Sequence, residues 1–325
     1  MSMTLRPSLR NKRILVTGGA GFIGSHLVDR LLADGAAEVI VIDNLFVGCE
    51  ANLADAMATG RCVFYKDDAE FATSIEYIFD AHDIDVVFNC ATKALNYSFL
   101  NPANAFSTNV AIALNLLEQQ RRGRFETLVH FSTSEVYGSA VYEPMDEKHP
   151  HHPTTTYAAG KAAADHAVES YVRMFGLDAF IIRPFNNYGP RQNCSGALAA
   201  IVPLTAWRIL NGATPEIHGD GLQSRDFIHV RDTVDAVLRL YEAMPRGDSV
   251  NVSTDNQVTV GELVPMICRL MDYDGEIARK PGRPSDVFCH NASNAKLRGM
   301  IEFNLTPFED GLRETLDWYR ARQSA

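Results

Sequence analysis

The sequence predicts an α/β protein with a doubly wound parallel sheet and a smaller C-terminal lobe. Short β-branched runs alternate with longer helical patterns through the first two-thirds of the chain, which is the rhythm of strand-helix-strand units. Each short run is continuously apolar, so both faces of its strand should be buried, as in a parallel sheet between two layers of helices. These two observations give the fold class.

The predicted strands follow one another at regular intervals. They are RILVT at 13–17, EVIVID at 38–43, CVFY at 62–65, DVVFNCA at 85–91, TLVHFSTS at 127–134, AFIIRPF at 179–185 and SVNVS at 249–253. Between the last two, the segments RPFNNYGPRQNCSG and NGATPEIHGDGLQSRDF are rich in Pro, Gly and Asn and predict loops. We therefore expect one domain from residues 1–185 with 226–253, and a second from 186–225 with 254–325.

The composition excludes several classes of protein. The chain has 325 residues, 46% of them hydrophobic, and a formal net charge of −10, whereas nucleic acid and anionic membranes require a basic face. Six scattered cysteines without a CxxC pair indicate neither disulfides nor a metal site. The N-terminal residues lack the apolar core of a signal peptide, and no run is long enough to span a membrane, so we expect a cytoplasmic protein.

A glycine-rich loop joins the first predicted strand to a helix. In TGGAGFIGSHL, Gly18 permits a tight turn, Gly21 lets the backbone approach a pyrophosphate, and Gly24 lets the helix pack on the strand. Asp43 ends the next strand, where a carboxylate accepts hydrogen bonds from an adenosine ribose and repels a 2′-phosphate. The spacing is GxxGxxG, and a tight turn is the alternative explanation, but the context predicts a dinucleotide site that favours NAD over NADP.

A phenol and an ammonium group lie one helical turn apart in TTTYAAGKAAADHA. Tyr157 and Lys161 share a helix face because they are separated by four residues. An isolated pair of this kind is more often an exposed amphipathic face. Here the strand before it ends in HFSTSEVYG, which brings the residues Ser132 to Glu135 to the carboxyl edge of the sheet, where a parallel sheet opens into its cofactor crevice.

Four motifs in this order, TGGAGFIGSHL, STSEVYG, YAAGK and RPFNNYGPRQ, resemble the extended short-chain dehydrogenase/reductase family of nucleotide-sugar epimerases, dehydratases and decarboxylases. The resemblance covers nearly the whole chain. It implies a Rossmann domain that holds NAD, a C-terminal lobe for a nucleoside-diphosphate sugar, and a homodimer formed through a four-helix bundle. It also implies cofactor contacts from Phe22, Ile23, Asn44, Asp67, Ala91 and Ser132, in addition to the glycines, Asp43, Tyr157 and Lys161.

The same resemblance implies the chemistry. Lys161 and the positive nicotinamide would lower the pKa of Tyr157, so that its phenolate takes a proton from a sugar 4-hydroxyl held by Thr133. Glu135 would remove the C5 proton of a 4-keto sugar. Ser134 stands where deoxythymidine-diphosphate-glucose dehydratases typically have an aspartate, which protonates the departing hydroxyl.

Glu135 favours one subclass, because the family members that stop at epimerisation usually carry a small residue there. The string TSE is similar to that of GDP-mannose dehydratases, UDP-N-acetylglucosamine 4,6-dehydratases and UDP-glucuronate decarboxylases, and ALNYSF resembles the second of these. A 4,6-dehydratase is the leading prediction. A UDP-glucuronate decarboxylase comes second and a 4-epimerase third. A non-catalytic NAD-binding scaffold is the alternative outside catalysis, disfavoured because Thr133, Tyr157 and Lys161 are all present.

Five polar residues are candidates for binding the substrate. Guanidinium groups suit diphosphate oxygens. The resemblance implies Asn186, Arg225 and Arg283 near the sugar diphosphate, Arg191 lies in the RPFNNYGPRQ motif, and Lys93 follows the fourth strand within reach of phosphate or sugar. Each arginine could instead form a surface ion pair, and Lys93 could be solvated.

Overall fold

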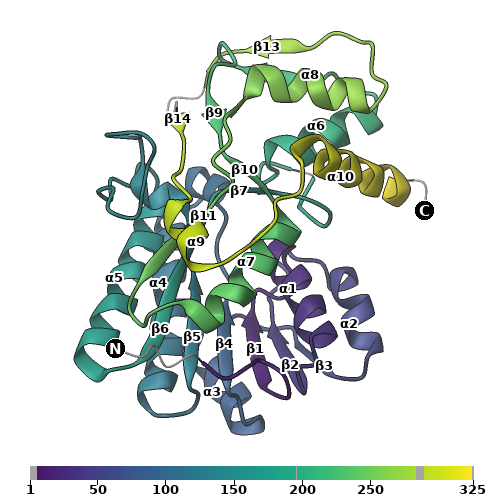
Figure 1. Ribbon diagram of the computed structural model, residues 1–325. Helices are drawn as coiled ribbons and strands as arrows, with labels where there is room; N and C mark the ends of the chain where they lie inside the picture. Colours follow the sequence, from purple (N-terminus) through teal and green to yellow (C-terminus); the bar gives the residue numbers. More distant parts are fainter. Residues whose placement is uncertain (1–5, 195, 283–288, 324–325) are drawn as a thin grey trace.

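A seven-stranded parallel sheet forms the core of the larger lobe, in the lower part of Figure 1. The computed structural model describes residues 6–194, 196–282 and 289–323. The strands are β1 (Arg13–Thr17), β2 (Glu38–Ile42), β3 (Cys62–Tyr65), β4 (Val86–Asn89), β5 (Thr127–Phe131), β6 (Asp178–Pro184) and β11 (Ser249–Val252). Their order is β11-β6-β5-β4-β1-β2-β3, and every neighbouring pair is parallel. The predicted fold class is therefore confirmed.

Helices cover both faces of this sheet. One face carries α1 (Phe22–Ala33), α2 (Ala54–Ala58), α7 (Val230–Ala243) and α9 (Ala295–Met300), and the other carries α3 (Ala72–Ala81), α4 (Pro102–Arg121) and α5 (Thr156–Phe175). Successive strand residues point to opposite layers, so Ile14 and Val16 pack in the first core while Leu15 packs in the second. Alternating burial on both sides explains why the strands are continuously apolar in sequence.

Helix α5, which carries Tyr157 and Lys161, begins at a side-chain cap. The hydroxyl of Thr155 accepts a hydrogen bond from the N–H of Ala158 at 3.2 Å, which satisfies one of the free donors of the first turn. Further along, a Cβ added at Gly160 would lie 2.7 Å from the carbonyl oxygen of Phe106 on α4. The two helices therefore approach closely at this glycine, and α4 fixes the position of α5.

The second lobe has a core of its own. It is built from α6 (Ile201–Leu210), α8 (Val260–Leu270) and α10 (Phe308–Gln323), with the short strands β7 (Asn186–Tyr188), β8 (Glu216–His218), β9 (Ser224–Arg225), β10 (Phe227–His229), β12 (Val258–Thr259), β13 (Ala278–Lys280) and β14 (Cys289–His290). Figure 1 shows α6, α8 and α10 together above the carboxyl edge of the sheet. The two Pro/Gly-rich segments predicted as loops contain β7, β8 and β9, because strand pairing with distant segments compensates for their weak local preference.

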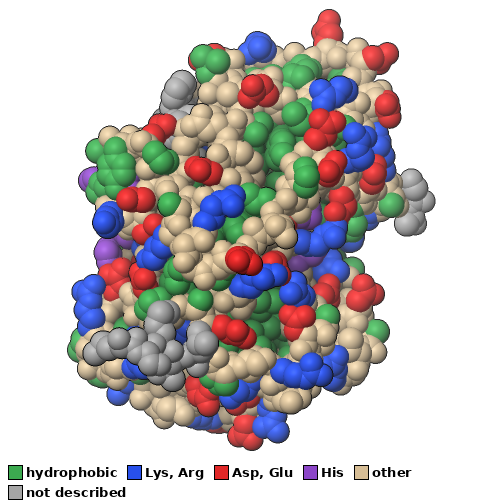
Figure 2. All heavy atoms as spheres, viewed as in Figure 1, with side chains coloured by type: hydrophobic (Ala, Val, Ile, Leu, Met, Phe, Trp, Pro, Cys, Tyr) green, Lys and Arg blue, Asp and Glu red, His purple; other side chains and the backbone are tan. Residues whose placement is uncertain are grey.

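The surface carries charges of both signs. Lys, Arg, Asp and Glu side chains are intermixed over the face drawn in Figure 2, which has no broad basic area of the kind that binds nucleic acid. Across the described residues, no helix is both long and apolar enough to cross a membrane. The five cysteines whose side chains are described are all free thiols.

Candidate active site

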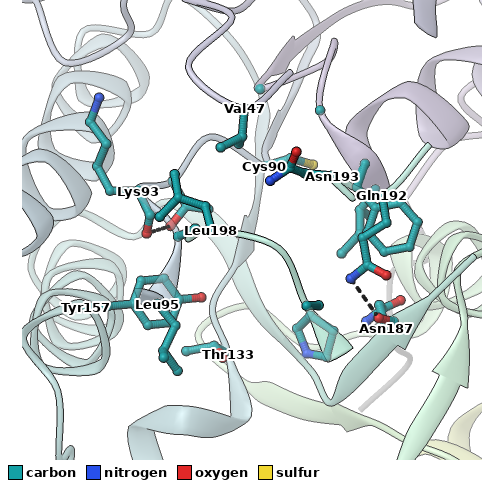
Figure 3. Close-up of a pocket in the computed structure, with 18 of the residues that line it drawn as sticks. Val47, Cys90, Lys93, Leu95, Thr133, Tyr157, Asn187, Gln192, Asn193 and Leu198 are labelled. Atoms are coloured by element: carbon teal, nitrogen blue, oxygen red, sulfur yellow. Dashed lines mark hydrogen bonds between the residues drawn. The ribbon is translucent and has the colours of Figure 1, made fainter. Parts of the chain in front are cut away.

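A cleft of about 560 Å³ lies between the carboxyl edge of the sheet and the second lobe (Figure 3). Loops that follow β1, β2, β4 and β5 form one wall, and residues of α6, β8 and β9 form the other. Ligands of open α/β sheets bind at this edge, outside the carboxyl ends of the strands. Most of the residues predicted for cofactor, substrate and catalysis therefore share one cavity.

The glycine loop leaves no room for side chains. Gly18 has φ +69°, and a Cβ there would lie 2.7 Å from the backbone nitrogen of Ala91. A Cβ at Gly24 would overlap the carbonyl oxygen of Gly18, so the helix packs directly on the loop. Gly21 caps α1 without a side chain, and Phe22 and Ile23 line the cleft. This arrangement presents free N–H groups of a helix N-terminus to an anion.

Asp43 and its neighbours form the end of the cleft next to this loop. The carboxylate of Asp43 accepts hydrogen bonds from the N–H groups of Ala20 at 3.0 Å and Leu45 at 2.8 Å, while burial raises its pKa. The side chain of Asn44 donates to Asp68 at 2.5 Å, and Asn44, Asp67 and Ala91 all line the cleft. These residues offer the acceptors that the hydroxyl groups of a ribose require.

Lys93 points toward this same end. Its Nζ lies 4.0 Å from the carboxylate of Asp68 and 4.4 Å from the ring centroid of Phe46. In Figure 3 the ammonium group points away from Tyr157. The side chain is only 10% exposed, so the alternative of a fully solvated lysine is excluded.

Tyr157 lies beside Thr133 on the wall of the cleft (Figure 3). Burial raises the pKa of Tyr157 to about 12, and hydrogen bonds with the hydroxyls of Thr133 and Thr92 oppose this rise. The negative charges of Glu135 and Asp165 raise this pKa further, because they oppose a phenolate. The lowering by Lys161 together with a bound nicotinamide stays a prediction for the protein loaded with NAD. Lys161 donates from Nζ to the carbonyl oxygen of Phe131 at 2.8 Å, and burial lowers its pKa to about 8.

The residues after β5 turn away from the sheet earlier than predicted. The strand ends at Phe131, and Thr133 caps the short 3₁₀ helix η3 (Ser134–Tyr137) by accepting a hydrogen bond from the N–H of Glu135 at 3.3 Å. This turn directs Ser132, Ser134 and Glu135 into the cleft next to Tyr157. The carboxylate, the phenol and two hydroxyls can thus act on one bound molecule.

The five predicted substrate residues do not all lie in the same place. Asn186 and Arg225 line the cleft, and Arg225 donates to the carbonyl oxygen of Ser224 at 2.8 Å. Arg191 is not among the lining residues described, and its guanidinium pairs with Asp29 of α1 at 2.7 Å. Arg283 lies outside the described residues.

Comparison with known proteins identifies the family. Residues 14–253 match the model of the NAD dependent epimerase/dehydratase family. The chain belongs to this family. It is 33% identical to a UDP-glucose 4-epimerase from Mycolicibacterium smegmatis over 95% of this chain and 98% of that protein. It is 34% identical to UDP-glucuronic acid decarboxylase 6 from Arabidopsis thaliana over 85% of this chain and 79% of that protein.

A solved structure supports the same assignment. The structure of a dTDP-glucose 4,6-dehydratase from Streptomyces venezuelae with NAD bound superposes with a TM-score of 0.90 at 31% identity, covering 96% of this chain and 98% of that one. NAD is therefore the cofactor of this epimerase/dehydratase family member, and the glycine loop and Asp43 fit it, because they leave space for a pyrophosphate and acceptors for a ribose. The relatives catalyse three different reactions, so membership alone leaves the reaction open.

The sequence did not single out the far end of the cleft. There Arg208 of α6 pairs with Glu216 of β8 at 2.9 Å, and His218 lies 3.4 Å from the same carboxylate. All three line the cleft together with Gln223. The available signal was the polar, loop-like composition of 211–227, but no spacing rule connects this segment with α6.

Proposed function

We propose that this chain is an NAD-dependent nucleotide-sugar 4,6-dehydratase that acts through a 4-keto intermediate. The supporting observation is that Glu135 lines the same cleft as Thr133 and Tyr157. Oxidation at C4 needs only the phenol and the cofactor. A carboxylate at this point supplies the additional base that elimination across C5 and C6 requires.

The residues of the cleft divide the proton transfers among them. Tyr157, as phenolate, takes the proton of the C4 hydroxyl, which Thr133 orients. NAD held by the glycine loop and Asp43 would supply the hydride acceptor at C4 and the hydride donor at C6, so the reaction would need no external oxidant. Glu135 removes the C5 proton, which the C4 carbonyl has made acidic, and the C6 hydroxyl leaves as water. C5 then regains a proton from solvent when the hydride returns to C6, and Tyr157 releases to solvent the proton that it took from the C4 hydroxyl.

Because residue 134 is a serine, another residue must protonate the leaving hydroxyl. A serine hydroxyl is a much weaker acid than a carboxylic acid, so Ser134 is unsuited to the role of the aspartate found in the related dehydratases. Glu135 becomes a carboxylic acid once it has taken the C5 proton, and it can pass this proton to the departing C6 hydroxyl. One residue then acts as base and acid in turn, and the protons balance without a second acid.

The two lobes have separate roles in this proposal. Residues 1–185 with 226–253, apart from strand β10, hold NAD, and residues 186–225 with 254–325, apart from helix α9, hold the nucleoside diphosphate. Asn186 and Arg225 serve the sugar diphosphate, since a guanidinium group binds phosphate oxygens in a fixed geometry. We expect the protein to act in the cytoplasm as a homodimer, and sedimentation at micromolar concentration tests the second expectation.

A panel of nucleotide sugars tests the reaction. Purified protein is incubated in deuterated water with UDP-, dTDP-, GDP- and CDP-sugars, both neutral and uronic, and the products are identified by NMR. A 4-keto-6-deoxy sugar with deuterium at C5 is the expected product. A C4 epimer without deuterium at C5 would contradict the dehydratase assignment, and so would the absence of any product in every case.

Decarboxylation is the second candidate, because a Ser-Glu pair at positions 134 and 135 also resembles that of UDP-glucuronate decarboxylases. A 4-keto uronic acid loses its C6 carboxylate as carbon dioxide, and no C5 base is needed. Incubation with UDP-glucuronate separates the two reactions, since carbon dioxide and a pentose product would favour this candidate. Tyr157→Phe protein that binds NAD and retains full turnover would remove the base on which both depend.

A further inference from the structure

A cluster of buried charged residues lies behind Lys161, on the side away from the cleft. It consists of Asp165 on α5, Arg183 on β6 and His130 on β5, whose exposed fractions are 0%, 2% and 0%. Arg183 pairs with the carboxylate of Asp165 at 3.0 Å, and Nε2 of His130 lies 3.7 Å from the other oxygen of the same carboxylate. The proposed reaction uses none of these three residues.

Hydrogen bonds fix the protonation of His130. The hydroxyl of Thr17 donates to Oδ1 of Asn89 at 2.7 Å, so the amide nitrogen of Asn89 must donate to Nδ1 of His130 at 3.0 Å. The neutral imidazole therefore carries its proton on Nε2, which faces Asp165. Burial, together with the charges of Lys161 and Arg183, lowers the pKa of His130 well below its usual value, so it adds no positive charge.

Lys161 and Asp165 lie one turn apart on the same buried face of α5. The titratable groups that face Lys161 from the elements around it are Asp165 on its own helix, Cys90 after β4 and His130 on β5. Burial raises the pKa of Cys90, so its thiol is neutral. Two buried cations, Lys161 and Arg183, therefore share the single carboxylate of Asp165 among the groups described here.

We propose that Asp165 is a positioning residue of the active site, whose carboxylate keeps Lys161 cationic and aligned on the wall that carries Tyr157. Its catalytic meaning rests on the proposed function, because only a reaction that needs a phenolate depends on the charge of Lys161. A buried ammonium loses its proton readily unless an anion compensates it. Asp165 supplies this anion from behind, which leaves the cleft face of Lys161 free for cofactor and substrate.

The competing explanation is that Asp165 serves Arg183 alone and only stabilises the fold. The two explanations differ in whether the titration midpoint of Lys161 shifts in variants of this cluster. If Asp165 supports Lys161, Asp165→Asn lowers the titration midpoint of Lys161. Arg183→Gln raises it, since this variant removes a second cation and frees the carboxylate. A purely structural role would destabilise both variants and leave the midpoint of Lys161 where it was.

NMR of protein labelled with ¹³Cε-lysine and loaded with NAD measures this midpoint without any sugar substrate, and Lys161→Arg assigns the resonance. We expect a midpoint below the usual value for lysine in the parent protein, because burial lowers it, a decrease on the order of 1 pH unit or more in Asp165→Asn, and an increase in Arg183→Gln. Asp165→Glu should restore the parental value. Tyr137→Phe is the matched control, because it removes a hydrogen bond to Arg183 at 3.1 Å without removing a charge.

The outcomes are distinct from those of the proposed function. Midpoints of Asp165→Asn and Arg183→Gln equal to that of the parent would overturn the inference, whatever reaction the protein catalyses. Absence of sugar turnover together with the expected shifts would overturn the function and leave Asp165 as a residue that controls the charge of Lys161. If Asp165→Asn does not fold, a double variant with Arg183→Gln removes the ion pair as a unit, and its midpoint must lie below that of Arg183→Gln alone.

Discussion

Ionisation of Tyr157 should depend on the cofactor. In the protein alone its pKa is raised to about 12 by burial. At pH 7 this leaves roughly one phenolate in 10⁵, and forming the phenolate costs about 7 kcal/mol. A unit positive charge brought to about 4 Å contributes about 4 kcal/mol at an effective dielectric constant of 20, which equals roughly 3 pH units. We therefore expect NAD to lower the midpoint of Tyr157 to about 9.

Protein labelled with ¹³Cζ-tyrosine and titrated with and without NAD gives this midpoint, and comparison with Tyr157→Phe assigns the signal. Tyr142 provides an internal control. Its pKa is also raised to about 12, but by a hydrogen bond to Asp146 on the surface, so NAD should not change it. Equal midpoints for Tyr157 in the two forms would refute the electrostatic reasoning, because the positive nicotinamide would then have no influence on the proposed base.

Three further predictions concern the cofactor site, the reaction and the fold. Gly24→Ala should purify without NAD, because its Cβ would overlap the carbonyl oxygen of Gly18; a full complement of NAD, measured by absorbance after denaturation, would contradict this. Glu135→Gln should retain oxidation at C4 but slow C5 deuterium exchange by about 10²- to 10⁴-fold, whereas the exposed Glu242→Gln should change neither; unaltered exchange in Glu135→Gln would exclude it as the C5 base. His229 is buried with its pKa lowered to about 4, so the unfolded state binds more protons below pH 6.5 and stability falls as the pH decreases toward 4. Urea unfolding should detect a loss of roughly 2 kcal/mol from this residue between pH 7 and pH 5, and His229→Phe should remove that part of the dependence; the same dependence in both proteins would show that another group causes it.

Much of the fold could be predicted from the sequence because its rules are local. Continuous apolar runs marked the parallel strands, since burial on both faces leaves no polar alternation. Glycines marked the loop before α1 because only Gly avoids a clash where backbone meets backbone. Tyr157 and Lys161 were found because helical periodicity alone places them on one face.

The remaining features depend on contacts between distant segments. Strand β8 was missed because its pairing partner, β13, lies some sixty residues away and the local composition favours a loop. The ion pair between Arg208 of α6 and Glu216 at the far end of the cleft was also missed, because it joins two segments that no local pattern connects. The raised pKa of Tyr157 in the protein alone could not be predicted from the sequence, because a charge four residues away is visible in sequence, whereas the depth of burial is not.

The residues proposed to perform the chemistry and those that surround the far end of the cleft come from separate stretches of chain. Thr133, Glu135, Tyr157 and Lys161 all precede residue 186, whereas α6, β8 and β9 follow it. A change of nucleotide preference could therefore be engineered by grafting residues 200–225 from a relative, without disturbing hydride or proton transfer. The same separation would let natural recombination diversify specificity while the reaction stays intact.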